Sequence, residues 1–401
     1  MTRLADRSTT SADATLHVGV RGGVPFLPYL EGMRGVAALY VVLYHVRILL
    51  EPGFASFGPT ADLLPFRGQF LLYGHFAVGV FIVISGYVLT LPVAVRGVLA
   101  GGRRRFLMRR ARRLLPAYYA ALTLAVPLWI LRSRIDHKPL TFPTVALQYF
   151  SHVLLIHDFN AHTIWGIDSP LWSVAVEVQI YLVFIVLLLP IALRWNLLLS
   201  VLVAFVLGYV PTIVGAVLHE TPYPLSHACF WFLGLFALGS VVAFVAYDKD
   251  DRFAALRLKV PWKAISICAT AAFVLLALPL YDDPQELSYR VDPILGIALA
   301  SGFLAIAKDQ SAGRRSLVAT VLAWRPLVYL GSFSYSLYLI HDPILLPVMH
   351  YLGGLKPWFR LSIAYVALVP AVVVASLGFA RVFEFPFVST ARRRSDVANS
   401  Y

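Results

Sequence analysis

The stretch EGMRGVAALYVVLYHVRILL, residues 31–50, carries two polar side chains in an otherwise apolar run: Arg34 and His45. They stand eleven residues apart. Eleven steps of 100° return to within about 20° of the start, so a helix presents both on one face, roughly 16 Å apart along its axis. Both groups are costly in lipid, which makes them candidates for a functional site. The alternative is a snorkelling arginine and a core histidine.

The rest of the chain has the composition of a membrane protein. Of its 401 residues, 59% are hydrophobic and 14% are charged, with a mean hydropathy of +0.75. These values exclude a soluble domain of this length and predict an all-α, polytopic membrane bundle with about ten transmembrane helices. The predicted spans lie near residues 34–50, 74–95, 114–131, 171–190, 197–217, 228–246, 262–280, 291–307, 328–348 and 359–383. The stretch 145–157 is too short to span, which favours an interfacial or re-entrant position.

The net charge of +13 is explained by topology, not by nucleic-acid binding. Residues 96–113 hold eight arginines, and other basic clusters lie at 247–263, 308–326 and 392–394. With about ten spans, these clusters all fall on the side of the N-terminal tail, and most loop acids fall opposite. The positive-inside rule then places both termini in the cytoplasm. We predict a multi-pass protein of a bacterial-type inner membrane, with a disordered tail at 1–28, one transmembrane domain at 29–386 and a basic tail at 387–401.

Glu177 is the acid whose depth matches that of His45. The segment SPLWSVAVEVQIYL enters the membrane from outside, so Glu177 lies about six residues, or near 9 Å, below the outer surface. His45 lies at a similar depth in its own span. We predict that the carboxylate orients the imidazole and raises its basicity. A purely structural pairing of Glu177 is the alternative.

Arg110 and Arg113 begin the third predicted span, in FLMRRARRLLPAYY. Their i, i+3 spacing places them on one helix face, and two guanidinium groups at a helix start suit a phosphate ligand. A positive-inside anchor is the alternative, and for Arg103 to Arg105 we favour it.

The remaining histidines leave chemistry open. His137, His152, His157 and His162 share the loop 132–170, but their spacing matches no compact ligand pattern, so we predict solvated or interfacial histidines and no metal. His75 and His341 each fit a structural role at least as well as a chemical one.

The same segments resemble the acyltransferase-3 family of membrane O-acyltransferases, the O-antigen acetylase-like group. The resemblance covers about residues 28–386 and rests on LEGMRGVAALYVVLYHV, VGVFIVISGYVL, FLMRRARRLLPAYY, SPLWSVAVEVQIYL and LGSFSYSLYLIHDPI. The family's Arg–ten residues–His pattern is matched by Arg34 and His45, and its Arg-x-x-Arg pattern by Arg110 and Arg113. Its Trp-Ser…Glu segment usually has two adjacent acids, whereas here Glu177 precedes Val178.

The resemblance implies transfer of an acyl group, commonly acetyl, from cytoplasmic acyl-CoA to a hydroxyl. Acyl-CoA is then a co-substrate and no cofactor is held permanently. His45 is expected as general base or acyl carrier, Arg34 as a group that steadies the donor, and Arg110 and Arg113 as phosphate ligands. The expected acceptor is a polysaccharide, a glycolipid or a natural product. A secondary transporter or an exporter of a lipid-linked sugar also needs buried His, Arg and Glu, and it is the alternative.

Overall fold

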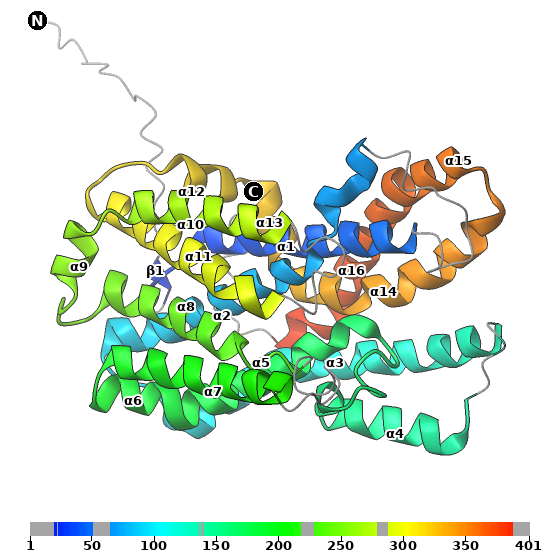
Figure 1. Cartoon of the computed structure of the whole chain (residues 1–401), viewed down its shortest axis with the longest axis horizontal. Helices are drawn as coiled ribbons and strands as arrows, with labels where there is room; N and C mark the ends of the chain where they lie inside the picture. Colours follow the sequence, from blue (N-terminus) through cyan, green and yellow to red (C-terminus); the bar gives the residue numbers. More distant parts are fainter. Residues whose placement is uncertain are drawn as a thin grey trace, which may run out of the picture.

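The computed structural model describes residues 20–21, 23–50, 65–135, 137, 140–217, 228–278 and 288–387. These ranges form an all-α bundle, apart from two short strands near the start (Figure 1). Strand β1 (Val20–Arg21) pairs antiparallel with β2 (Val24–Pro25), and the turn uses Gly23 at a φ of 78°. The predicted tail thus holds one short strand pair, and its disorder stays a prediction. The rest of the predicted tail before residue 20, and the basic tail after residue 387, lie outside the described residues.

Three long helices carry the first polar motifs. Helix α1 (Pro28–Leu49) has proline in its first turn, where the missing N–H costs nothing, and it contains both Arg34 and His45. Helix α2 (Gly74–Arg96) ends at Gly97, whose φ of 72° forms a left-handed cap. Helix α3 (Gly102–Ile135) runs for 34 residues and begins with the arginine cluster.

The other helices follow in chain order. They are η2 (Pro65–Leu71), α4 (Phe142–Val153), η3 (His157–Phe159), η4 (Ser169–Leu171), α5 (Trp172–Val183), η5 (Phe184–Leu188), α6 (Leu189–Arg194), α7 (Leu197–Val217), α8 (Phe232–Tyr247), α9 (Ala254–Lys259), α10 (Trp262–Ala277), α11 (Ser288–Ser311), α12 (Leu317–Leu322), α13 (Arg325–Ser332), α14 (Ser334–Tyr351), η7 (Leu352–Gly354), α15 (Pro357–Ser362), η8 (Ile363–Leu368), α16 (Val369–Phe383) and η9 (Phe385–Phe387).

Each predicted span overlaps helical residues, but not all of these helices are long. In the described part of the chain, seven helical segments are long and apolar enough to cross a membrane. Helices α8 and α10 are apolar but have 16 residues each, and the span predicted at 328–348 is divided at Phe333 into α13 and α14. The protein is thus polytopic, whereas the count of ten and the cytoplasmic position of both termini stay predictions.

Helices α2 and α8 pack closely because each offers a glycine to the other. A Cβ on Gly86 would overlap the carbonyl oxygen of Phe236, and one on Gly239 would overlap that of Val83. Small residues of this kind let membrane helices approach to backbone contact. A hydrogen bond of 2.9 Å from Thr90 Oγ1 to Ser240 Oγ joins the same pair of helices.

Helix α1 contributes to two apolar cores. It runs through the middle of the view in Figure 1. Ala37 and Val41 pack into the core that α2, α3, α5 and α8 share, whereas Ala38 and Val42 pack into the core with α14 and α16. The two core-facing stripes leave a third stripe of α1 for Arg34 and His45. This division of one helix between two cores positions the candidate site.

Candidate active site

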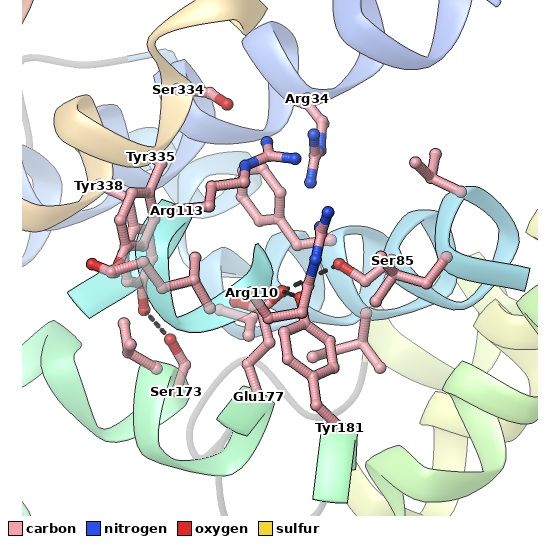
Figure 2. A pocket seen from close by; sticks show the side chains of 17 residues that line it. Arg34, Ser85, Arg110, Arg113, Ser173, Glu177, Tyr181, Ser334, Tyr335 and Tyr338 are labelled. Atoms are coloured by element: carbon pink, nitrogen blue, oxygen red, sulfur yellow. Dashed lines mark hydrogen bonds between the residues drawn. The ribbon is translucent and has the colours of Figure 1, made fainter. Parts of the chain in front are cut away.

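Three arginines meet in a cavity between α1, α2, α3, α5 and α14, which we call the arginine cavity. Arg34 comes from α1, and Arg110 and Arg113 come from the start of α3. Figure 2 shows the three guanidinium groups turned toward a common space. The cavity volume is about 60 Å³, and its wall also includes Ser85, Ser173 and Tyr181. The structure thus brings together the three cations that the sequence assigned to the donor.

Glu177 is a carboxylate in the wall of this cavity. It accepts a hydrogen bond of 3.0 Å from Ser85 Oγ and a second, short one from the hydroxyl of Tyr181, one helical turn further along the chain (Figure 2). The Glu177 carboxylate also attracts the Arg110 guanidinium electrostatically. Three guanidinium groups therefore face one carboxylate among the lining side chains.

The arginine cavity contains hydrogen-bond donors that are available to a ligand. Across the described ranges, the buried Nε atoms of Arg34 and Arg110 have no hydrogen-bond partner, although Glu31 lies 3.9 Å from Arg34 Nη1. Buried N–H groups without partners are costly unless a ligand or water satisfies them. An excess of positive charge together with spare donors suits an anionic group such as a phosphate.

A second and larger cavity, which we call the outer cavity, lies beside the first. Its volume is about 440 Å³, and Val78 and Tyr338 line both cavities. The outer cavity has four aromatic side chains and four titratable ones in its wall: Tyr44, Trp165, Trp172, Tyr338, His45, His75, Arg132 and Asp342. Aromatic faces combined with a few polar groups are typical of a small-molecule site.

His45 is held by its Nδ1 atom. This nitrogen lies 2.9 Å from the carbonyl oxygen of Val41 and 3.2 Å from Nε2 of His341. The two imidazole rings meet edge to face, with centroids 4.7 Å apart. His45 is half-buried, whereas His341 is fully buried. The neighbouring ring thus fixes the orientation of the imidazole that lines the outer cavity.

The predicted pairing of Glu177 with His45 is therefore wrong. The two residues line different cavities, and each has its own hydrogen-bond partners: Ser85 and Tyr181 for Glu177, and Val41 and His341 for His45. The physical reason is that depth along a span fixes the level of a side chain but not the face from which it projects. Glu177 projects from the face of α5 that also carries Tyr181 and that turns toward Ser85 of α2.

His75 forms a second buried polar group in the wall of the outer cavity. Its Nε2 lies 3.1 Å from Oδ2 of Asp292, which also accepts a hydrogen bond of 2.6 Å from Trp231 Nε1. The imidazole stacks on Trp172 at an interplanar angle of 7°. This cluster joins α2, α11 and the residue before α8 at the cavity, so His75 anchors the wall as well as lining it.

Sequence reasoning left several cavity residues without an assignment. His341 and Asp342 are adjacent in SLYLIHDPI, and the presence of both in one predicted span was the available signal. Arg132 at the end of α3, and the tryptophans Trp165 and Trp172, carried no comparable signal. These residues come from α3, α14, the start of α5 and the segment between α4 and η4, and they are far apart in the chain.

Two loop histidines are buried, although the sequence favoured solvated or interfacial positions. His152 and His157 are fully buried, and their rings stack 3.9 Å apart at an angle of 9°. Burial lowers the pKa of His152 to about 4 and that of His157 to about 3, so both are neutral at pH 7. Burial likewise raises the pKa of the nearby Asp158 to about 6. The polarity of the loop sequence concealed this packing.

The family model for the acyltransferase domain matches residues 27–382, nearly the whole bundle. The chain belongs to the acyltransferase-3 family. The match includes each helix that lines the two cavities, from α1 to α14. The resemblance expected from the five sequence stretches is thereby confirmed.

Curated relatives show what similar proteins are named for. The chain is 28% identical over 340 residues to YrhL of Bacillus subtilis (strain 168), named provisionally as a peptidoglycan O-acetyltransferase; the match covers 80% of this chain and 49% of YrhL. It is 24% identical to the peptidoglycan O-acetyltransferase OatA of Listeria monocytogenes, over 94% of this chain and 57% of that protein. It is 26% identical to the O-acetyltransferase OatA of Staphylococcus aureus (strain NCTC 8325), over 81% and 52% respectively. The chain spans about half the length of these relatives, and no solved structure matches it.

Proposed function

We propose that this protein is a membrane O-acyltransferase that moves an acetyl group from acyl-CoA to a hydroxyl of a carbohydrate. The observation that carries the proposal is the position of His45, which lines an aromatic cavity that meets the arginine cavity at Val78 and Tyr338. The family and the O-acetyltransferase names of the relatives support this reaction class.

The arginine cavity is proposed as the donor side. Coenzyme A carries several phosphate charges on a nucleotide and a long, thin pantetheine arm that ends in the thioester. Guanidinium groups of Arg110, Arg113 and Arg34 bind phosphate oxygens through charge-assisted hydrogen bonds. The small volume of about 60 Å³ suits part of the thin arm or a phosphate, not the whole donor. Acyl-CoA acts here as a co-substrate, and Glu177 offsets part of the positive charge when the site is empty.

The outer cavity is proposed as the acceptor side. Its volume of about 440 Å³ accommodates a sugar ring, and its tryptophans offer flat apolar faces against which such rings stack. Asp342 and His75 provide groups that bind hydroxyls. Two of the relatives are named for peptidoglycan O-acetylation, so a cell-wall polysaccharide is the acceptor class that we favour.

The chemistry proposed for His45 is general-base catalysis. The imidazole takes the proton of the acceptor hydroxyl while the hydroxyl oxygen bonds to the thioester carbonyl carbon. The carbon–sulfur bond then breaks, and the thiolate of coenzyme A receives the proton from the imidazolium. If the acyl group is carried on the ring instead, a ring nitrogen bonds to the same carbon while the carbon–sulfur bond breaks and coenzyme A leaves as a thiolate. The acceptor oxygen then bonds to this carbon while the carbon–nitrogen bond breaks, and the hydroxyl proton passes through the freed imidazole to the thiolate. Both routes need an unprotonated nitrogen of His45 at the cavity.

The proposed location is a cytoplasmic membrane with both termini inside. In this orientation the basic start of α3 faces the cytoplasm, where the donor is made, in line with the positive-inside rule. The outer cavity then faces the opposite side. Acyl transfer across the bundle would follow from the meeting of the two cavities.

The test compares His45→Asn with wild-type protein in isolated membranes supplied with radiolabelled acetyl-CoA. We expect transfer of label to all acceptors to fall at least about 100-fold, as expected for loss of a general base. Asparagine retains an N–H near the Nδ1 position, which preserves the bond to Val41.

A matched control exists in His137→Asn, because His137 is exposed and its φ of 54° suits asparagine. This control should keep wild-type transfer. Transfer that survives in His45→Asn at equal abundance contradicts the proposal. Movement of an unmodified sugar lipid without any label transfer would favour the exporter instead.

A further inference from the structure

We infer that His341 is the positioning residue that sets the tautomer of His45, so that Nε2 of His45 is the nitrogen that accepts the proton of the acceptor. The inference rests on the proposed function of His45 and assigns a role to a residue that the mechanism above does not use. The hydrogen bonds of His341 are the observations on which this assignment depends.

The neighbours of His341 determine which of its ring nitrogens carries the hydrogen. Its Nδ1 lies 2.7 Å from the carbonyl oxygen of Tyr338 and 3.2 Å from that of Leu337. A carbonyl oxygen only accepts hydrogen bonds, so Nδ1 of His341 carries the hydrogen. In the neutral ring, Nε2 then holds the lone pair. The ring is fully buried, which favours the neutral form over an imidazolium.

The lone pair on Nε2 of His341 determines which nitrogen of His45 carries the hydrogen. Nε2 of His341 accepts, so the atom that faces it at 3.2 Å, Nδ1 of His45, must donate. The carbonyl of Val41 at 2.9 Å requires the same assignment. If Nδ1 of His45 lacked its hydrogen, two lone pairs would face it at hydrogen-bond distance.

The basic nitrogen of His45 is Nε2. With the hydrogen on Nδ1, the lone pair of neutral His45 resides on Nε2. The ring borders the outer cavity, and its Nδ1 is turned toward α1 and α14. When His45 becomes an imidazolium during transfer, His341 Nε2 keeps a hydrogen-bond acceptor beside its Nδ1–H. A histidine that orients another in this way corresponds to the acid that orients the base in hydrolase triads.

The anchor of His341 is itself fixed. Tyr338, whose carbonyl receives the Nδ1–H, donates its hydroxyl hydrogen to the carbonyl of Pro170 at 2.9 Å and accepts from Ser173 Oγ at 2.7 Å. These bonds join α14 to the start of α5, at the point where the two cavities meet. The pair of histidines therefore has a rigid support in the wall where the two cavities meet.

Two variants of His341 separate positioning from folding. Asparagine keeps an N–H near the Nδ1 position, and so the bond to Tyr338, but loses the acceptor at the Nε2 position. Glutamine places its carbonyl oxygen near the Nε2 position and keeps that acceptor. In the membrane assay with labelled acetyl-CoA, we expect kcat to fall about 10- to 100-fold in His341→Asn, as for other residues that orient a ligand group. His341→Gln should stay within about fivefold of wild type, and the KM for acetyl-CoA should stay unchanged in both.

Activity of His341→Asn equal to wild type overturns the inference, as does an equal loss in both variants. If both variants fail to fold, ¹⁵N NMR of histidine-labelled wild-type protein decides, with His45→Asn used to assign the signal. Protonated Nδ1 and unprotonated Nε2 in His45 support the inference, and the reverse overturns it. The proposed function fails separately, when His45→Asn keeps its activity whatever the His341 variants do.

Discussion

The two cavities differ in size, charge and lining, although one helix contributes to both. The arginine cavity is small, with three guanidinium groups and one carboxylate, whereas the outer cavity is about seven times larger and is lined by two tryptophans and two histidines. Arg34 and His45, eleven residues apart on α1, belong to different cavities. The Arg–ten residues–His spacing therefore joins two unlike sites, one suited to an anion and one to an uncharged ring.

The largest difference between variants of the two cavities is expected for the arginines of α3. Arg113→Ala and Arg110→Ala should each raise the KM for acetyl-CoA about 10- to 100-fold, because each removes a charge-assisted hydrogen bond. The kcat should fall less than about threefold. Steady-state rates in membranes with varied acetyl-CoA measure both.

The control for this prediction is Arg112→Ala, because Arg112 is exposed between the two cavity arginines. This variant should leave the KM for acetyl-CoA within about twofold of wild type, because an exposed charge contributes little interaction energy. A fall in kcat at constant KM in the Arg113 variant would move that residue from donor binding to structure or chemistry.

An intermediate effect is expected in the outer cavity. Trp172→Leu removes an aromatic face that also stacks on His75, so the rate of label transfer at saturating acetyl-CoA should fall about three- to tenfold. The KM for acetyl-CoA should not change. Trp195→Leu is the matched control, since Trp195 is 72% exposed. A raised donor KM in Trp172→Leu would mean that the donor occupies the outer cavity.

A smaller effect, of opposite sign to the arginine variants, is expected for Glu177→Gln. The amide can still accept from Ser85 but leaves the three arginines without their carboxylate. Donor binding should tighten, with a two- to fivefold fall in the KM for acetyl-CoA, the order of magnitude of one partly solvated charge. A hundredfold loss of kcat at unchanged KM would instead assign Glu177 to catalysis, as the sequence first indicated.

The smallest effect on the two cavities is expected from His152 and His157, because these residues lie outside both. Their titration should change the pH dependence of stability. The lowered pKa values of His152 and His157 mean that the unfolded chain binds more protons than the folded one below pH 6.5. The two rings should therefore lower the free energy of unfolding as the pH drops from 6.5 toward 4, by about 2 kcal/mol for each ring at pH 5. The raised pKa of Asp158 acts in the opposite direction and should offset about 1 kcal/mol of this loss.

Thermal unfolding in detergent across this range measures the effect. The double variant His152→Phe, His157→Phe should show a weaker pH dependence, because phenylalanine does not titrate. An unchanged dependence in the double variant would show that other groups cause it. Since the pair lies outside both cavities, we expect the KM for acetyl-CoA to remain the same in this variant.

The sequence predicted the class of the fold better than its details. Apolar runs placed the helices because lipid requires about twenty apolar residues per span. They did not predict that Phe333 divides one span or that α8 and α10 are short, since these features depend on how neighbouring helices pack. The strand pair at β1 and β2 was missed because a two-residue strand leaves no periodicity.

For the candidate site, the sequence identified the cations and the histidine but not their neighbours. Spacing within one helix placed Arg34 with His45, and Arg110 with Arg113, because helical geometry fixes such pairs. The partner of His45 comes from 296 residues further along the chain, and choosing it requires the rotation of α14 about its axis. Depth alone could not distinguish His341 from Glu177.

A structure of the protein with a non-hydrolysable thioether analogue of acetyl-CoA would show which of the two cavities binds the donor. We predict density for the phosphates at Arg110 and Arg113, with the arm passing Tyr338 and the acyl carbonyl next to Nε2 of His45. An analogue whose phosphates lie at Arg132 in the outer cavity, or whose acyl end lies away from His45, would contradict the division of donor and acceptor between the two cavities.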